Sequence, residues 1–286
     1  MIPSIRQPAA FRILWKLYVA LFFVYLALPL VVVSVFAFND SLFPSLPWKG
    51  FTLEWFFGQS RPMIGVFNER PIMRALGNSA FIAVMVSALS VAVGTSNAFL
   101  FNRYQFRFRG LLYVLLLLPL VIPGIVLGIS ILIFSSNVAN GLEDGFGWDI
   151  AALRPGLVLV ILGQFSFIAT IVTLVVSARL QKFDPTLEEA ALNLGATRLT
   201  AVRTITLPYL MPALVGGFIV AFLMSFENFN TTLMLVGSDA PLTIAMFDRL
   251  KEGSTPLLNA VSLVLMIGST GLALLMILFQ GRRTGG

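Results

Sequence analysis

Few side chains in this sequence could carry out chemistry, and those that could are polar groups set within apolar stretches. The 286-residue chain contains no histidine and no cysteine, which removes the commonest general base, the commonest metal ligand and all thiolate chemistry. A phosphate-binding loop that ends in Gly-Lys-[Ser/Thr] is also absent, because no lysine is followed by serine or threonine. We therefore expect no catalytic residue, no metal site and no bound cofactor in this chain.

One carboxylate within an apolar stretch is the strongest candidate for a binding role. Glu227 lies in the stretch 209–236, where an ionised group is costly and rarely faces lipid. Together with nearby polar residues it could line a pathway for a cationic solute. The candidates are Ser225, Glu227, Asn228, Asn230 and Gln164. Two other readings stay open: hydrogen bonds between helices, and a position of Glu227 near the outer membrane interface.

The segment 184–208 has the signals of two short helices. Asp184 is a favourable N-cap and Pro185 is preferred at the first helical position, while Gly195 is typical of a helix end. Thr197 can cap a second helix, which we expect to end before Pro208. The first helix would carry a small apolar face made of Leu187, Ala190, Ala191 and Leu194. This face suits insertion into a groove on a partner, and packing back onto the chain itself is an equally good interpretation.

The same segment contains a spaced motif: Glu189-Ala190-Ala191, then Gly195, then Ile205 and Leu207-Pro208. It resembles the inner-loop motif of the permease subunits of binding-protein-dependent ABC importers, and every spacing matches. The resemblance implies a coupling helix that docks into a cleft on a cytosolic ATPase subunit. The docking residues that it implies are Glu188, Glu189, Ala190, Ala191, Gly195, Ala196, Leu207 and Pro208.

Over nearly the whole chain the sequence is similar to the second permease of the spermidine/putrescine importers, in segments that include Asn39-Asp40 and Gly195-Ala196-Thr197. That branch often has acidic residues directly after Ser-Phe, whereas Glu227 here is followed by Asn228. The resemblance implies a polyamine or related organic cation as the solute. Amino-acid-like compounds and ferric ion are carried by relatives of the same importer class and stay open as alternatives.

The resemblance also implies partners. They are a second homologous permease subunit, two cytosolic ATPase subunits that bind ATP and Mg²⁺, and an extracytoplasmic substrate-binding protein, with no role for nucleic acid. Whether the second permease is a different chain or a copy of this one stays open. The first rival class is a secondary transporter with its own coupling ions, which would favour internal repeats and paired intramembrane charges that the sequence lacks. The second is a structural membrane protein with no pathway, which would not need the motif.

The elements that must position these residues are membrane helices. The chain is 58% hydrophobic and 11% charged, whereas a soluble domain carries about a quarter charged residues. Six apolar stretches approach the roughly 20 residues that a helix needs to cross a bilayer; they are 17–38, 77–101, 111–134, 156–176, 209–236 and 257–279. Because these stretches are continuous rather than alternating, we expect an all-α polytopic bundle of about six transmembrane helices. Residues 1–286 would form a single permease domain, with an inner loop at about 177–208.

Charge asymmetry sets the expected orientation. Most of the 19 Lys and Arg residues fall in the segments that lie inside if both termini are cytosolic, among them Arg6, Arg282 and Arg283. We expect a multi-pass protein of the bacterial cytoplasmic (inner) membrane, with its first apolar stretch retained because a signal peptide's is shorter. In the third stretch Pro119, Pro123, Gly124 and Gly128 could break the helix, although ordinary use of Pro and Gly in membrane helices is the favoured interpretation.

Overall fold

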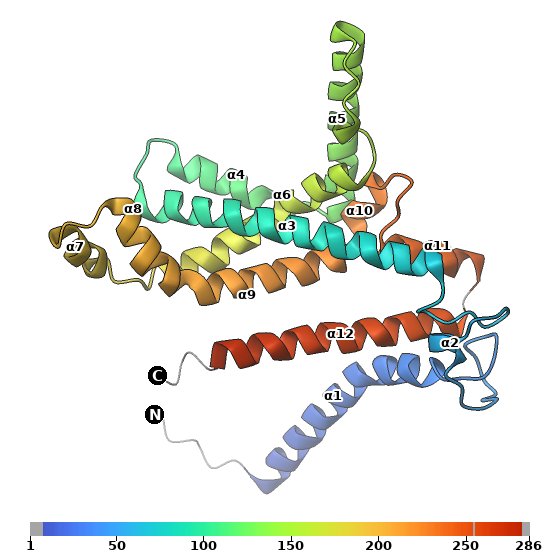
Figure 1. Ribbon diagram of the computed structural model, residues 1–286. Coiled ribbons are helices and arrows are strands. Elements are labelled where there is room, and N and C mark those ends of the chain that lie inside the picture. The colour runs from blue at the N-terminus through green and yellow to red at the C-terminus, as the bar shows by residue number, and fades with distance from the viewer. Residues whose placement is uncertain (1–7, 254, 282–286) are drawn as a thin grey trace. The chain divides into compact units, whose positions relative to one another are not determined.

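The computed structural model describes residues 8–253 and 255–281, and these form helices joined by irregular connections (Figure 1). Arg6, Arg282 and Arg283, which contribute to the expected charge asymmetry, lie outside the described residues. Among those residues, six helices are long and apolar enough to cross a membrane. They are α1 (Ala9–Phe36), α3 (Arg70–Arg103), α5 (Gly124–Phe146), α6 (Leu157–Leu180), a continuous helix over Arg198–Phe226, and α12 (Pro256–Gly281). The all-α membrane fold and the number of spans are confirmed.

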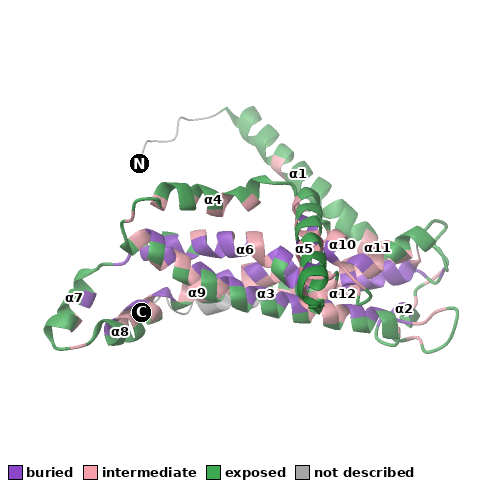
Figure 2. Ribbon diagram, turned by 90° about the horizontal axis from the view of Figure 1, so that it is seen from above, coloured by how far each residue is buried: buried purple, intermediate pink, exposed green. Residues whose placement is uncertain are grey.

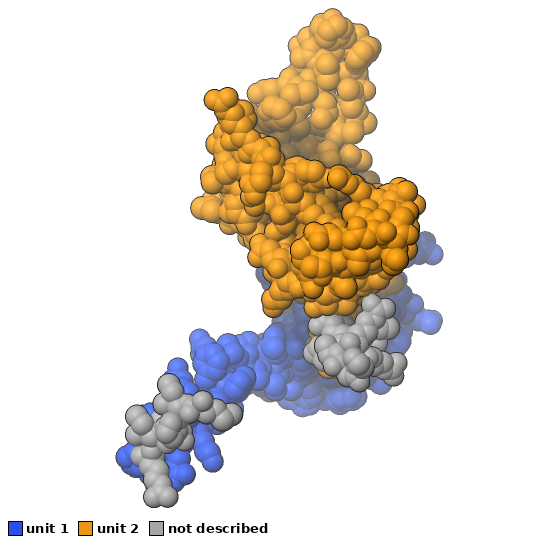
Figure 3. All heavy atoms as spheres, turned by 90° about the vertical axis from the view of Figure 1, so that its left-hand side faces the viewer, with its two compact units in different colours: residues 1–70, 249–268 blue, residues 71–248, 269–286 orange. Residues whose placement is uncertain are grey.

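The chain divides into two compact units, coloured separately in Figure 3. The first comprises residues 1–70 and 249–268, and it includes the long connection after α1 that contains α2 (Glu54–Phe57). Buried Asn39 organises this connection: its side chain accepts the Lys49 N–H at 3.1 Å and donates to the Ser45 carbonyl at 3.3 Å, and its own carbonyl accepts the Trp55 indole N–H at 3.0 Å. The connection thus has structure of its own, as its length predicts.

The second unit, residues 71–248 and 269–286, is built around α6. Figure 2 shows buried residues along this helix, and 56% of its most apolar window is buried, against 33% or less in the other spans. It packs against α9 (Leu207–Phe226) and α4 (Arg109–Val121). Ile168 and Val172 of α6 join Val86 of α3 and Leu210 of α9 in the core. An apolar helix that is covered on most sides belongs in the centre of a bundle.

The third expected span, 111–134, is two helices rather than one. α4 ends at Val121, and α5 begins at Gly124 and continues to Phe146. Pro123 has no N–H to donate and disfavours helical backbone in the preceding residue, so Ile122 is extended at φ −75° and ψ 128°. The favoured interpretation of the Pro and Gly residues as ordinary helix residues was therefore wrong at Pro123.

The fifth expected span, 209–236, is also interrupted. α9 ends at Phe226 and a short helix, α10 (Asn230–Leu235), follows. The Asn228 side chain accepts the backbone N–H of Thr232 at 3.2 Å and its hydroxyl at 2.9 Å. A short polar side chain that bonds to nearby backbone competes with helix continuation, which accounts for the break. The remaining elements are η1 (Ala151–Leu153) and α11 (Leu242–Glu252).

The second helix of the 184–208 segment does not end before Pro208, and that prediction was wrong. α8 (Arg198–Ala201) continues through a π-helical turn, η2 (Val202–Thr206), into α9, where Pro208 lies in the first turn. A proline can follow this turn because it has no N–H that needs a partner and the wider π turn relieves the clash with the preceding carbonyls. The 184–208 segment is thus joined directly to a membrane-spanning helix.

Candidate functional site

The first helix of the 184–208 segment is α7 (Thr186–Asn193), and its two ends follow the sequence signals. The Asp184 carboxylate accepts the backbone N–H of Thr186 at 3.0 Å and its hydroxyl at 2.8 Å, so Asp184 caps the helix. Gly195 has a left-handed backbone at φ +89°. Its N–H donates to the Leu192 carbonyl and that of Ala196 to the Ala191 carbonyl, each at 3.0 Å, which is a Schellman ending. Thr197 then caps α8 by accepting the Thr200 N–H at 3.2 Å.

The apolar face of α7 is not covered by the rest of the described chain. Leu187 is 50% exposed, Leu194 is 89% exposed and Ala190 is also exposed. Figure 1 places α7 at one end of the second unit, beyond α8. Of the two interpretations left open for this face, packing back onto the chain is therefore not what the structure shows. The surface is available to a partner, and Glu189, Gly195 and Leu192 are exposed with it.

Glu188 is the exception on α7, because its carboxylate points into the chain. Arg103, the last residue of α3, donates to both carboxylate oxygens, with Nη2 at 2.9 Å from Oε1, and Thr206 of η2 donates its hydroxyl to Oε1. The Arg103 guanidinium also lies 5.5 Å from the Phe99 ring centroid and 5.6 Å from that of Phe183. We call Arg103, Glu188 and Thr206 the loop anchor. Neither Arg103 nor Thr206 is predicted from the sequence to belong to a site, because no local pattern links them to Glu188.

The loop anchor holds the pKa of the Glu188 carboxyl below its ordinary value, chiefly through the hydrogen bonds from Arg103. Partial burial opposes this by disfavouring the charged form, and the hydrogen bond from Thr206 supports it. Hydrogen bonds from Thr186 likewise lower the pKa of the Asp184 carboxyl at the start of α7. Both carboxylates are therefore held in the ionised form at neutral pH.

Acidification is expected to loosen α7. A carboxyl whose pKa is lowered on folding stabilises the folded loop above its ordinary pKa, 4.5 for Glu188, and this stabilisation is lost as the pH falls through the lower folded value. In this cysteine-free chain, a spin label on Leu194→Cys should become more mobile when the pH is lowered from neutrality to below that range. In a Glu188→Gln background, where this side chain no longer titrates, the pH-dependent change should be smaller. An equal change in both backgrounds would contradict the role of Glu188.

The ends of α3, α6 and α9 that lie close to the loop anchor are linked to one another by side-chain contacts. Asn102 of α3 donates to the Ser177 hydroxyl of α6 at 3.0 Å and accepts from Gln181 at 3.2 Å. The Arg179 guanidinium of α6 lies 4.2 Å from the ring centroid of Tyr209 in α9. Polar and cation–π contacts of this kind fix helix ends relative to one another. The 184–208 segment is thus attached to helices that are themselves linked.

Two of the predicted pathway residues, Gln164 and Ser225, lie inside the second unit rather than on its surface. Gln164 is 1% exposed; its amide donates to the Thr232 hydroxyl at 2.8 Å and its carbonyl oxygen accepts from the Ser225 hydroxyl. The three side chains join α6, α9 and α10, and all of them have partners, as buried polar groups require. This arrangement matches the alternative of a hydrogen bond between helices. Thr232, the third member, is not predicted from the sequence.

The other predicted pathway residues lie at the break between α9 and α10. Glu227 and Asn230 are exposed and Asn228 is half-buried. The α4–α5 break reaches the same place: the Thr231 hydroxyl donates to the Gly124 carbonyl at 3.3 Å, and a Cβ on Gly124 would lie 3.2 Å from the Asn230 Cβ. Interrupted helices that meet in this way can present carbonyls and polar side chains to a solute within a membrane. The sequence does not predict that these two breaks lie next to each other.

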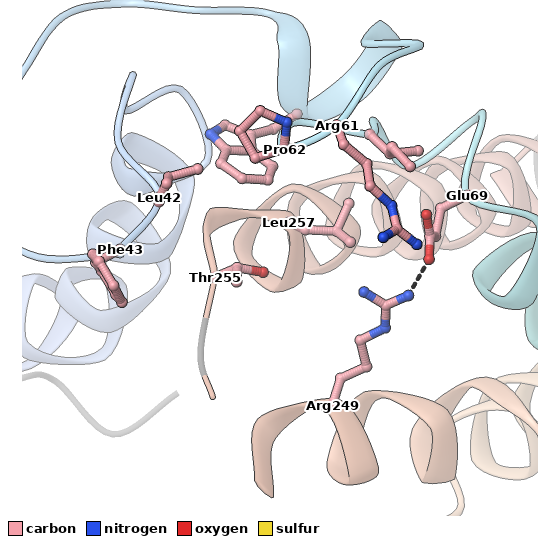
Figure 4. A pocket seen from close by; sticks show the side chains of 10 residues that line it. Leu42, Phe43, Arg61, Pro62, Glu69, Arg249, Thr255 and Leu257 are labelled. Atoms are coloured by element: carbon pink, nitrogen blue, oxygen red, sulfur yellow. Dashed lines mark hydrogen bonds and ion pairs between the residues drawn. The ribbon is translucent and has the colours of Figure 1, made fainter. Parts of the chain in front are cut away.

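A cavity of about 540 Å³ lies in the first unit (Figure 4). Its lining includes Trp55, Arg61 and Leu257, and Arg249 forms an ion pair with Glu69 across it. The Arg61 guanidinium points toward this pair in Figure 4. None of these residues is predicted from the sequence to form a site.

The fold and these regions define a polytopic membrane transport protein with two interrupted helices and a loop helix exposed at one end. Residues 90–282 match the family described as "Binding-protein-dependent transport system inner membrane component". The chain belongs to this family: it is a permease subunit of an ABC importer, and not an enzyme. Members of this class operate in general with a partner permease, an ATPase and a substrate-binding protein.

Curated relatives match over most of the chain. The putrescine transport system permease protein PotI of Escherichia coli (strain K12) is 29% identical over 95% of this chain and 90% of its own length. The spermidine/putrescine permease PotC of Haemophilus influenzae is 29% identical over 88% and 91% of the two chains. The sulfate permease CysT of Salmonella typhimurium is 31% identical over 71% and 75%.

A solved structure gives the same fold. A bacterial ABC transporter that imports the acidic polysaccharide alginate has a chain that superposes with a TM-score of 0.74 at 19% identity, covering 95% of this chain and 96% of that one. An amino acid ABC transporter superposes with a TM-score of 0.52 at 19% identity over 76% of this chain and 96% of that one. Because both identities are low, these likenesses bear on the fold alone.

Proposed function

We propose that this permease forms half of the translocation pathway for a polyamine or a related organic cation. The observation that carries the proposal is the exposed carboxylate of Glu227, which lies where the α9–α10 break meets the α4–α5 break. A carboxylate in a membrane-spanning region attracts a cation and is rarely found there without a function. The similarity to PotI and PotC, whose names specify putrescine and spermidine, supports the same class of solute.

The roles of the individual residues follow from their positions. Glu227, Asn228 and Asn230 contact the solute; Glu227 and Asn228 follow the end of α9, and Asn230 begins α10. Gln164 and Ser225 hold α6, α9 and α10 together behind them. In this proposal they support the pathway rather than line it.

The 184–208 segment couples this permease to a cytosolic ATPase subunit. The small face of α7, with exposed Ala190 and half-buried Ala191 along it and Gly195 and Ala196 at its end, enters a cleft on that subunit together with the exposed Glu189. Leu207 and Pro208 connect the segment to α9. The assembly comprises this chain, a second permease, two ATPase subunits that bind ATP and Mg²⁺, and an extracytoplasmic binding protein. Both termini and the 184–208 segment lie on the cytosolic side of the inner membrane.

Transport follows alternating access. When ATP closes the two ATPase subunits on each other, the docked α7 helices approach, and the two permeases open outward to receive the solute from the binding protein. Hydrolysis reverses these movements and opens the pathway to the cytosol. The permease contributes the pathway and the docking surface, and the ATPase contributes the chemistry.

The test is solute uptake by the complete transporter in proteoliposomes. We expect ATP-dependent uptake of radiolabelled putrescine, with Glu227→Gln lowering it by about tenfold because a charge-assisted contact is lost. Asp144→Asn, a matched change at an exposed position near the end of α5, should leave uptake near the wild-type rate. Uptake that follows an ion gradient without ATP, or preference for ornithine, ferric ion or sulfate over putrescine, would contradict the proposal.

A further inference from the structure

Apart from the chain connections at its two ends, α7 is attached to its own bundle through one charged side chain, that of Glu188. Glu188 is the buried residue of α7, while the neighbouring Glu189 and Ala190 are exposed. The Glu188 side chain is 12% exposed and that of Arg103 is 27% exposed. Any displacement of α7 must therefore reach the membrane helices through its chain connections, residues 181–185 to α6 and the Gly195 turn to α8, or through this carboxylate.

The pairing of Glu188 with Arg103 fixes a direction as well as a distance. The Arg103 Nη1 and Nη2 groups donate to Glu188 Oε2 and Oε1 respectively. A two-point contact of this kind resists rotation as well as separation. The Phe99 and Phe183 rings on the guanidinium hold Arg103 in place. A lysine ammonium could supply the charge but not the two-point geometry.

Thr206 makes the same carboxylate a junction of three elements. Its hydroxyl donates to Glu188 Oε1, and Thr206 is the last residue of the π turn that leads into α9. Arg103 ends α3, so one carboxylate connects α7 with the inner ends of two membrane-spanning helices. π-helical turns are frequent at functional positions because they can shift without breaking the helix.

We propose that Glu188 is a positioning residue that transmits the movement of α7 to α3 and α9, and that it does not contact the ATPase. This inference rests on the proposed docking of α7, and it assigns Glu188 a different role from the docking role that the motif implied. The adjacent Glu189 keeps the docking role. Adjacent residues of a helix are about 100° apart around its axis, so the two carboxylates face different ways, one toward the chain and one toward the partner.

The test compares Glu188→Gln and Arg103→Lys with the matched control Glu189→Gln in the complete transporter. We expect Glu188→Gln and Arg103→Lys to keep ATPase co-purification at the wild-type level, while ATP-driven putrescine uptake falls by about 2- to 30-fold, the range expected when a coupling contact is lost. ATP hydrolysis should continue but respond less to the loaded binding protein. Glu189→Gln should instead weaken co-purification. The double variant Arg103→Glu/Glu188→Arg keeps an ion pair with the two charges exchanged. It should therefore recover part of the uptake that is lost in Arg103→Glu alone or in Glu188→Arg alone.

A distance measurement separates transmission from simple loss of stability. The chain has no cysteine, so spin labels can be placed at Asn193, which is exposed in α7 outside its apolar face, and at exposed Leu100 in α3. If the loop anchor couples the two elements, ATP should leave the distance between the labels unchanged in the wild type and alter it in Glu188→Gln. A distance that responds to ATP equally in both would overturn the proposal.

Two further results bear on it. Loss of ATPase co-purification in Glu188→Gln would show that Glu188 is a docking residue and would overturn the assignment. A wild-type complex that neither co-purifies an ATPase nor takes up solute with ATP would instead refute the proposed function on which the inference rests. The wild-type and variant measurements therefore distinguish the two failures.

Discussion

Replacing Gly195 with aspartate is expected to abolish transport while leaving the membrane bundle folded. Gly195 ends α7 with φ at +89°, and a Cβ built there would meet nothing within 4 Å in this chain. Intramolecular packing therefore does not require a glycine, and the backbone strain of an aspartate in this conformation is about 1 kcal/mol. The larger effect comes from the side chain and charge placed on the docking surface. We expect co-purification of the ATPase and putrescine uptake to fall at least tenfold, about the loss caused by truncating a central interface residue.

Gly147→Asp is the matched control for this change. Gly147 also follows a helix in a left-handed conformation, at φ +71° after α5, and a Cβ there also meets nothing within 4 Å. The two variants share the residue change and the backbone strain, but Gly147 lies far along the chain from α7. Gly147→Asp should keep ATPase co-purification. Equal losses in both variants would attribute the effect to strain and contradict docking at Gly195.

Replacing Gly94 with leucine is expected to disrupt the second unit. Gly94 of α3 is buried against α6, where a Cβ would lie 3.0 Å from the Thr173 backbone nitrogen and 3.0 Å from the Val172 Cβ. Small residues allow membrane helices to approach this closely. Because one of the obstacles is backbone, a leucine forces the helices apart, and overpacking of this kind costs about 3 kcal/mol. Thermal unfolding in detergent should show a large loss of stability, or the protein should fail to accumulate in the membrane.

Gly77→Leu makes the same change in the same helix at an open position. A Cβ on Gly77 meets nothing within 4 Å and the residue is exposed. Leucine has the higher helix propensity, so this variant should be as stable as the wild type or slightly more stable. Similar unfolding temperatures for Gly94→Leu and Gly77→Leu would contradict the close α3–α6 contact.

The sequence was sufficient for the features that depend on local chemistry. Continuous apolar stretches predict the number of spans, because backbone in lipid must satisfy its own hydrogen bonds. Asp184, Gly195 and Thr197 predict the ends of α7 and the start of α8, because capping involves groups two to five residues apart. The spacing of the motif gave the family, which the match over residues 90–282 confirms.

The breaks in the third and fifth spans were harder to predict. Pro123 is a possible helix breaker, but prolines are common in membrane helices and neighbouring helices usually compensate for them, so the sequence favours an unbroken helix there. The second break depends on Asn228 bonding to Thr232, which is one of several conformations open to that side chain. Pro208 shows the opposite case. The sequence predicts that a helix ends before it, but Pro208 lies in the first turn of α9, where the helix continues from the π turn η2.

The sequence by itself thus determined that this chain is a multi-span permease with a capped helix in the 184–208 segment. It could not determine which of the adjacent carboxylates, Glu188 or Glu189, faces the chain, because both lie in the first turn of α7 and both favour its positive end. Only the tertiary structure decided this, by bringing Arg103, 85 residues away, and Thr206, 18 residues away, to the same side of the helix. The physical reason is that a charge pair between distant segments leaves no local pattern, whereas a helix cap does.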